Sequence, residues 1–216
     1  MKRATVFVLV AFAAAASVAA AGIRPTDQRL AERLTLRLAD FDSRWTTDSP
    51  PSTRLDRVPC ATAPKIEGAI TGYSKSAGFL PRDHADKRYA TDTTRVFLSL
   101  ATARAWYAWA GAGESACLLK RAVASWKRYG HGFKVSRLRH ARNSLTLHCS
   151  SCPAHQLSAW RYGFTLAKQG QNDTTFVIDW VVVRKERAVI ALYFESVDFP
   201  FGPDGGRLVS KLLERR

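Results

Sequence analysis

The carboxyl-terminal third of the chain alternates apolar and polar residues over consecutive short stretches, and this pattern constrains the fold more than any other feature. The apolar positions of the first stretch are Trp160, Tyr162, Phe164 and Leu166. The next stretch, 174–183, is strongly apolar, and the charged run 184–187 joins it to 188–195. A period of two residues is that of a β-strand, and a short polar connection joins antiparallel neighbours. The sequence therefore predicts an antiparallel sheet that contains a hairpin over 174–195.

Helical periodicity is present on both sides of these strands. One pattern begins at Pro25 and continues to Phe41, a second region runs from Thr102 to Tyr129 with a break at 111–113, and a last helix follows Pro203. The residues expected to be buried on these helices are Leu30, Leu34, Leu38, Phe41, Trp106, Trp109, Ala110, Leu118, Leu119, Ala122, Val123, Trp126, Leu208, Val209, Leu212 and Leu213.

Shorter patterns complete the expected set of elements. Strands are expected within 65–76, 95–100 and 133–138 and around Leu145 and Leu147, whereas 46–64 and 78–94 are polar, turn-rich and expected to be loops. Consecutive strands flanked by helices indicate the α+β class, with an antiparallel sheet packed with helices. We expect an amino-terminal helix and linker over 22–58 and a single α+β domain over 59–216.

The first 21 residues have the order of a secretory signal peptide. A basic start, Met1 to Arg3, precedes an uncharged stretch in which Ala19 and Ala21 form an A-x-A pattern. We therefore expect cleavage before Gly22 and a secreted, extracytoplasmic protein. The alternative is a retained membrane anchor, because about 18 apolar residues can just span a hydrocarbon core.

The chain is strongly basic, with 33 Lys and Arg against 18 Asp and Glu, and residues 22–216 keep a formal charge of +13. Such a charge favours anionic partners, among them phospholipid head groups and acidic or phosphorylated polymers of the envelope. The charges are dispersed along the chain, however, and an Arg- and Ala-rich composition also arises from a GC-rich genome. No specific nucleic-acid binding is expected, since clear base-stacking strands are missing from the pattern.

The four cysteines are Cys60, Cys117, Cys149 and Cys152. An even number in an exported chain indicates disulfides. Because Cys149 and Cys152 are so close in sequence, we expect the pairs Cys60–Cys117 and Cys149–Cys152. The first pair closes a long loop and should stabilise the fold, whereas the second closes almost none.

The segment from His148 to His155 allows more than one interpretation. A bridge between Cys149 and Cys152 would pin a loop, whereas a low-pKa thiolate in a C-x-x-C pair would catalyse thiol–disulfide exchange. Two cysteines and two histidines are also a zinc ligand set. Export into an oxidising compartment favours the structural bridge. Attachment of c-type haem is excluded because Pro153, and not histidine, follows Cys152.

The rest of the chain offers no catalytic constellation. The segment 72–78 does not match G-x-S-x-G, and no S-x-x-K occurs. His84 has Asp83, Asp86 and Asp92 nearby, but polar loops commonly gather such residues for solubility. We therefore expect no enzymatic activity, no catalytic residue, no cofactor and no metal.

Tryptophan is frequent, and three of the six residues are candidates for a ligand groove: Trp106, Trp109 and Trp160. Aromatic side chains beside arginine suit an apolar or ring-bearing ligand. The competing interpretation is a core helix that packs its tryptophans against the sheet.

Several segments together resemble a group of exported actinobacterial envelope proteins with a PsbP-like α/β/α sandwich, relatives of the extracellular sensor domain of the mycobacterial kinase PknH. The matching features are Pro59-Cys60, Val96-Phe97-Leu98, Ala116-Cys117-Leu118-Leu119, the hairpin 179–194 and the terminal helix, over 59–216. The resemblance implies a Cys60–Cys117 disulfide and a non-enzymatic binding or sensing module, and it transfers no catalytic residue. Cys149 and Cys152 have no counterpart in it, and the hairpin turn lacks the expected glycine.

These observations favour an exported, non-catalytic binding or sensing module of the cell envelope, with anionic envelope components or an apolar ligand as partners. The alternatives are a thiol–disulfide oxidoreductase that uses Cys149 and Cys152, and a carrier of anionic polymers.

Overall fold

The structure is a computed structural model that describes residues 22–55, 60, 62–129, 134–143, 156–167, 170 and 172–215. The expected signal peptide and the strand expected around Leu145 and Leu147 lie outside these ranges. Among the described residues, no helix combines the length and apolar character needed to cross a bilayer.

Within the described ranges, eight strands form one antiparallel sheet. In order across the sheet they are β1 (Trp45–Ser49), β3 (Gly78–Pro81), β4 (Tyr89–Phe97), β8 (Ala188–Val197), β7 (Thr174–Lys185), β6 (Gln156–Ala167) and β5 (Lys134–Arg142), while β2 (Ile70–Lys75) pairs with the second half of β4. The predicted α+β class, with an antiparallel sheet packed with helices, is confirmed.

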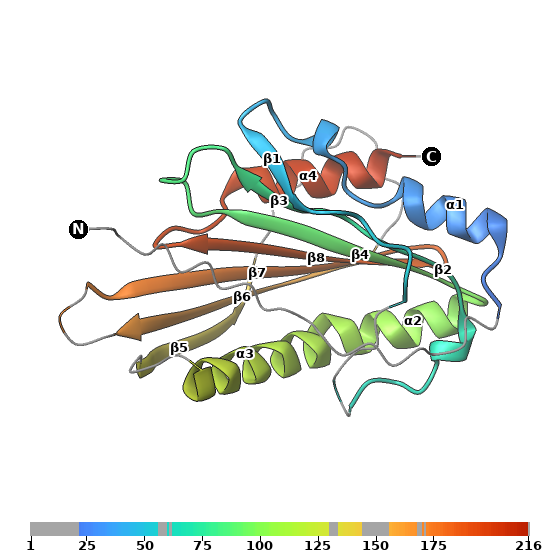
Figure 1. Cartoon of the computed structure of the whole chain (residues 1–216). Helices are drawn as coiled ribbons and strands as arrows, with labels where there is room; N and C mark the ends of the chain where they lie inside the picture. The colour runs from blue at the N-terminus through green and yellow to red at the C-terminus, as the bar shows by residue number, and fades with distance from the viewer. Residues whose placement is uncertain are drawn as a thin grey trace.

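Helices cover both faces of the sheet (Figure 1). On one face lie α1 (Pro25–Arg33) and α4 (Pro203–Glu214), and on the other lie α2 (Leu100–Trp109) and α3 (Ser115–Tyr129). Successive residues of β8 serve the two faces in turn, with Ile190 and Leu192 in the core below α1 and α4 and Val189 and Ala191 in the core below α2 and α3. This alternation is the expected consequence of the strand period.

The β7–β8 hairpin and the last helix agree with their sequence patterns. Lys185 pairs with Ala188, so Glu186 and Arg187 form the turn, and Glu186 adopts a φ of 52°. The predicted apolar stripe of α4 is buried: Leu208, Val209, Leu212 and Leu213.

The end of α4 returns to the beginning of the described chain. The Arg215 guanidinium donates hydrogen bonds to the carbonyl oxygens of Arg33 and Thr35, at 2.9 and 2.7 Å, and it contacts the carboxylate of Asp40. Lys211 Nζ donates to the Asp40 carbonyl oxygen at 2.6 Å. The described residues 22–55 therefore pack against the rest of the described chain.

The helix predicted over 25–41 is wrong in its second half. α1 ends at Arg33, and the chain then runs in an irregular path to a 3-10 turn, η1 (Leu38–Asp40). Leu34 and Leu36 are buried, but Leu38 is exposed. The spacing of leucines continued the helical pattern beyond the point at which the backbone leaves it.

The two predicted loops are wrong in part. β1 begins the segment 46–64, and η2 (Glu67–Ala69) leads from it into β2, while β3 and most of β4 occupy 78–94. The strand predicted over 95–100 instead ends at Phe97, so Leu98 and Leu100 are exposed. Arg95 and Phe97 lie on the same face of β4, as the alternation predicted, and this face points toward α2 and α3.

The break predicted at Gly111 and Gly113 does not separate two helices. Residues Ala110–Glu114 form a π-helical turn, η3, that connects α2 directly to α3. On α3, Leu119 is buried and Leu118 and Val123 are partly buried, as the predicted stripe requires.

Candidate functional site

The π-helical turn η3 is held by side chains of the sheet. Trp180 Nε1 on β7 donates to the Ala110 carbonyl oxygen at 3.2 Å, and Ser158 Oγ on β6 donates to the Gly111 carbonyl oxygen at 3.3 Å. A Cβ atom on Gly111 would lie 2.8 Å from Ser158 Oγ, so glycine permits this close approach. π-helical turns inside α-helices are often found at functional sites.

Arg95 lies beneath α2, on the face of β4 that the helices cover. Its side chain is buried, with 4% of the residue exposed. The guanidinium carbon lies 5.5 Å from the ring centre of Tyr73 and 5.1 Å from that of Trp106, and Nη1 donates to Thr93 Oγ1 at 3.1 Å. Nε has no hydrogen-bond partner among the described residues. A guanidinium has five N–H donors and always carries its charge, so the Nε donor leaves part of its bonding capacity unused among the described residues.

Glu114, the last residue of the π-helical turn, is the second buried charge. Glu114 is also only 4% exposed, and its Oε2 atom has no hydrogen-bond partner within the described part of the chain. Burial raises the pKa of the Glu114 carboxyl to about 7, and the positive charge of Arg95 lowers that pKa by a smaller amount. Between these two described residues there is no ion pair, so opposite charges share one interior without neutralising each other by contact.

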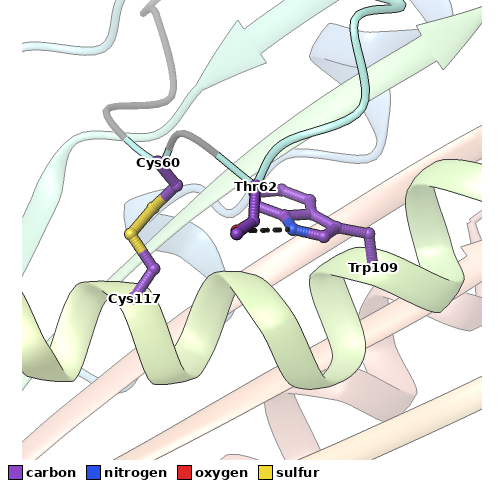
Figure 2. The surroundings of a disulfide bond; sticks show 4 residues. All are labelled: Cys60, Thr62, Trp109 and Cys117. Atoms are coloured by element: carbon purple, nitrogen blue, oxygen red, sulfur yellow. Dashed lines mark hydrogen bonds between the residues drawn. A yellow bond between two sulfur atoms is a disulfide. The ribbon is translucent and has the colours of Figure 1, made fainter.

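A second tryptophan, Trp109, packs on Trp106, and a disulfide lies near it (Figure 2). The ring of Trp106 is 5.1 Å from the ring of Trp109 in an edge-on arrangement, and Trp109 Nε1 donates to Thr62 Oγ1 at 3.3 Å. The predicted Cys60–Cys117 disulfide is present, and it ties the segment that carries Thr62 to α3 (Figure 2). The disulfide thereby holds the segment with Thr62, which is far from α3 in sequence, over Trp109.

This arrangement favours the binding of an anionic group. An unpaired charge in a protein interior costs several kcal/mol unless a partner is provided. Among the described residues, Thr93 accepts a hydrogen bond from Arg95, and the pKa of the neighbouring Glu114 carboxyl is raised to about 7 by burial. A ligand with an anionic group for Arg95, a polar group for Glu114 and an apolar body against the aromatic rings would satisfy these side chains.

The three groove candidates occupy different positions. Trp106 is 1% exposed and belongs to the core, and Trp109 is partly buried next to it. Trp160 lies on β6, where its ring centre is 4.5 Å from that of His140 and 5.6 Å from the guanidinium of Arg142. The structure therefore brings Trp106 and Trp109 together and leaves Trp160 near the sheet edge.

A cleft of about 500 Å³ is present on the opposite side of the sheet. It lies between the segment that follows α1 and the end of β1, and its lining includes Glu32, Arg37, Ser52 and Phe79. The buried charges Arg95 and Glu114 do not line it.

The remaining predicted site residues, Cys149 and Cys152, lie outside the described residues, as do His148 and His155. The structural, redox and zinc interpretations of that motif stay predictions.

Arg95 and Glu114 were not predicted from the sequence as partners in a site. One signal was available, since Arg95 was expected on the same strand face as Phe97. Glu114 follows two glycines that were interpreted as a helix break, and only a helix that continues through the π-helical turn brings its carboxyl inward.

No protein-family model matches the chain, and no curated protein matches it. Solved structures that are similar to it include two proteins of Mycobacterium tuberculosis. The extracellular domain of PknH from Mycobacterium tuberculosis is 12% identical with a TM-score of 0.40, over 88% of this chain and 98% of that one. LpqN, involved in cell envelope biogenesis of the same organism, is 16% identical with a TM-score of 0.31, over 83% of this chain and 92% of that one. The expected resemblance to exported actinobacterial envelope proteins is found, and it is one of fold.

Proposed function

We propose that this protein is an exported, non-catalytic binding or sensing module of the cell envelope, and that Arg95 and Glu114 hold its ligand. The observation that carries the proposal is a pair of buried, opposite charges on separate elements, with unused hydrogen-bonding atoms and no ion pair between them among the described residues. The amino-terminal signal pattern and the Cys60–Cys117 disulfide support an oxidising, extracytoplasmic location.

The chemistry of the site suggests the class of ligand. Arg95 suits a carboxylate or phosphate, because the planar guanidinium binds either group through two parallel hydrogen bonds. Tyr73 and Trp106 add aromatic surface beside the charge. A small ring-bearing or aliphatic anion therefore fits better than an inorganic ion.

The disulfide-tied loop supports a role in controlling access. Thr62 is exposed and bonded to Trp109, which packs on Trp106 above Arg95. Movement of this short segment would free the Nε1 side of Trp109. The Cys60–Cys117 bond limits that movement because it holds one end of the segment to α3.

Calorimetric titration with phenyl phosphate, benzoate and inorganic phosphate tests the proposal. We expect the ring-bearing anions to bind, inorganic phosphate to bind more weakly, and Arg95→Gln to abolish binding. Arg104→Gln is the matched control, because Arg104 is an exposed arginine of α2 and its loss removes the same charge. Glu114→Gln keeps a polar group at that position and should weaken binding less than Arg95→Gln does.

Circular dichroism of each variant verifies that the fold is retained. Equal affinity of the wild-type protein and the Arg95→Gln variant for phenyl phosphate, or no affinity of the wild-type protein for either ring-bearing anion, would contradict the proposal.

A further inference from the structure

The indole nitrogen of Trp106 is a further unused donor beside Arg95. Trp106 is 1% exposed, and its Nε1 atom has no hydrogen-bond partner among the described residues. The indole nitrogens of Trp109 and Trp180, by contrast, both donate hydrogen bonds within the protein. A buried indole N–H normally finds an acceptor, because it can only donate. Trp106 therefore departs from its two neighbours.

The unused donor of Trp106 belongs to the same group of atoms as the two buried charges. Arg95 Nε and Trp106 Nε1 are donors, and Glu114 Oε2 is an acceptor. The guanidinium carbon of Arg95 lies 5.1 Å from the ring centre of Trp106. The positive charge of Arg95 lowers the pKa of the Glu114 carboxyl, but by less than burial raises it. A ligand for this group must therefore bring both acceptors and a donor.

A simple anion would satisfy only the two donors. Its oxygens would accept from Arg95 and Trp106, but Glu114 would stay without a partner. The bound anion would also neutralise the positive charge that favours the Glu114 carboxylate, and a second negative charge nearby favours the protonated carboxyl. Glu114 would therefore have to take up a proton from water when the anion binds.

A cationic group on the ligand would satisfy Glu114 without proton uptake. An ammonium group carries a positive charge and donates up to three hydrogen bonds, so it pairs with the ionised carboxylate. A hydroxyl group could donate one hydrogen bond to Glu114 but would leave its charge unmatched. Hydrogen bonds between ionised groups are about twice as strong as neutral ones. An ammonium group therefore fits Glu114 better than a hydroxyl group does.

We propose that the ligand is a zwitterion of the α-amino acid type with an apolar, ring-bearing side chain. Its carboxylate accepts hydrogen bonds from Arg95 Nε and Trp106 Nε1, and its ammonium group donates to Glu114 Oε2. Arg95 and Glu114 are each 4% exposed, so a compact ligand with adjacent charges fits better than a long one. This class of ligand rests on the proposed function, in which Arg95 and Glu114 hold the ligand.

Calorimetric titration with three matched ligands measures the contribution of the ammonium group. Free phenylalanine, phenyllactate and hydrocinnamate share a ring and a carboxylate, and beside the carboxylate they carry an ammonium group, a hydroxyl group and a hydrogen atom respectively. We expect phenylalanine to bind about tenfold or more tighter than hydrocinnamate, with phenyllactate between them. Equal or tighter binding of phenyllactate or hydrocinnamate would overturn the proposal.

Proton uptake provides a second readout. The titrations are repeated slightly above neutral pH in buffers with different heats of ionisation, which measures the protons taken up on binding. We expect hydrocinnamate to draw protons into the complex and phenylalanine to draw clearly fewer, because only the simple anion leaves the Glu114 carboxylate unpaired. Equal uptake with both ligands would count against an ammonium group at Glu114.

Glu114→Gln tests the partner of the ammonium group. Glutamine has no charge to pair with, so this variant should lose the preference for phenylalanine over hydrocinnamate while it still binds hydrocinnamate. Glu186→Gln is the matched control, because Glu186 is exposed in the β7–β8 turn and the same charge is removed. The control should keep the preference, and an unchanged preference in Glu114→Gln would overturn the proposal.

Trp106→Phe keeps an aromatic ring but removes the indole N–H. It should weaken the binding of phenylalanine and hydrocinnamate alike by about fivefold, because both ligands carry the carboxylate. Trp45→Phe is the control, since Trp45 is buried in the core on the other face of the sheet, and it should change neither affinity. Circular dichroism verifies the fold of both variants. Undiminished affinity of Trp106→Phe would overturn the role of Trp106.

These outcomes separate the class of ligand from the proposed function. If hydrocinnamate binds through Arg95 and the ammonium group brings no gain, the proposed function stands and the zwitterion is wrong. If none of the three ligands binds, the zwitterion is also wrong, and the titrations with phenyl phosphate and benzoate decide the proposed function by themselves.

Discussion

Asp92 on β4 accepts a hydrogen bond through Oδ1 from the backbone N–H of Leu36, 2.9 Å away, in the interior below α1 and α4. Thr94, two residues further along β4, donates to the carbonyl oxygen of Leu34 at 3.2 Å. These bonds hold the chain after α1 against the sheet in a non-helical path. A carboxyl group in this position is costly to ionise, because water does not reach it.

We predict that stability falls as pH rises from about 4 to about 7. Burial is the main cause that raises the pKa of Asp92 from 3.8 to about 7, so the folded protein keeps a proton that the unfolded chain has already released. The stabilisation that Asp92 contributes is fully present below its pKa in the unfolded chain, and it is lost as pH rises above its pKa in the folded protein. Urea unfolding at several pH values measures the effect.

Asp92→Asn provides the control for this pH dependence. The amide oxygen can still accept from Leu36, but the side chain no longer ionises, so the curve of stability against pH should become flatter. Glu114→Gln should flatten it independently, since burial also raises the pKa of Glu114 to about 7. An undiminished slope in the double variant would show that other groups cause it.

The Cys60–Cys117 bond should be the main covalent contribution to stability. It joins residues 57 positions apart, and replacing both with serine should cost about 4 kcal/mol through the entropy of the unfolded chain. Replacing Cys149 and Cys152 should cost clearly less, because they would close a very short loop. Chemical denaturation under non-reducing conditions compares the variants, and equal losses would contradict the predicted pairing.

Gly72→Ala should strongly destabilise the contact between α1 and β2. A Cβ atom at this position would collide with the Asp27 carbonyl group and would lie 2.9 Å from the Gln28 backbone nitrogen, so backbone and not a flexible side chain would have to move. We expect a loss of about 2 kcal/mol or more, in the range of overpacking. Gly68→Ala is the control, since its Cβ would meet nothing within 4 Å, and it should change stability little.

Glu186→Asn should stabilise the β7–β8 turn by about 0.5–1 kcal/mol. Glu186 adopts a left-handed φ of 52°, which asparagine tolerates better than glutamate does. Glu186→Gln removes the same charge but does not reduce the backbone strain. Thermal unfolding of both variants therefore separates the effect of charge from the effect of backbone strain. A gain as large from glutamine as from asparagine would point to charge as the cause.

Elements with one clear periodicity were predictable, and elements that bury polar residues were not. β6, β7, β8 and α4 bury apolar stripes and match the sequence analysis. Most of β4 was interpreted as a loop because residues such as Asp92 and Thr94 are polar, yet both are buried. Their hydrogen bonds come from the chain after α1 and from neighbouring side chains, and no local pattern reveals such partners.

The candidate site shows the same division. The disulfide and the aromatic character of 106–109 were predictable from residue types and spacing. The relation between Arg95 and Glu114 depends on the π-helical turn, whose hydrogen bonds to Trp180 and Ser158 come from strands that follow it in sequence. Glycines often end a helix, but the helix continues through Gly111 and Gly113 here because side chains of the sheet donate hydrogen bonds to the turn.

The contacts of Arg215 with Arg33 and Thr35 set the time at which folding can finish. Arg215 lies 182 positions beyond Arg33 in the chain, and α4 completes the core above which α1 lies. At a synthesis rate of about 5–20 residues per second, roughly 10 to 35 s separate the appearance of these partners. During this interval the apolar side of α1 has no α4 to cover it. We therefore expect a chain that ends before α4 to expose the apolar side of α1 and to aggregate or be degraded more readily than the full chain.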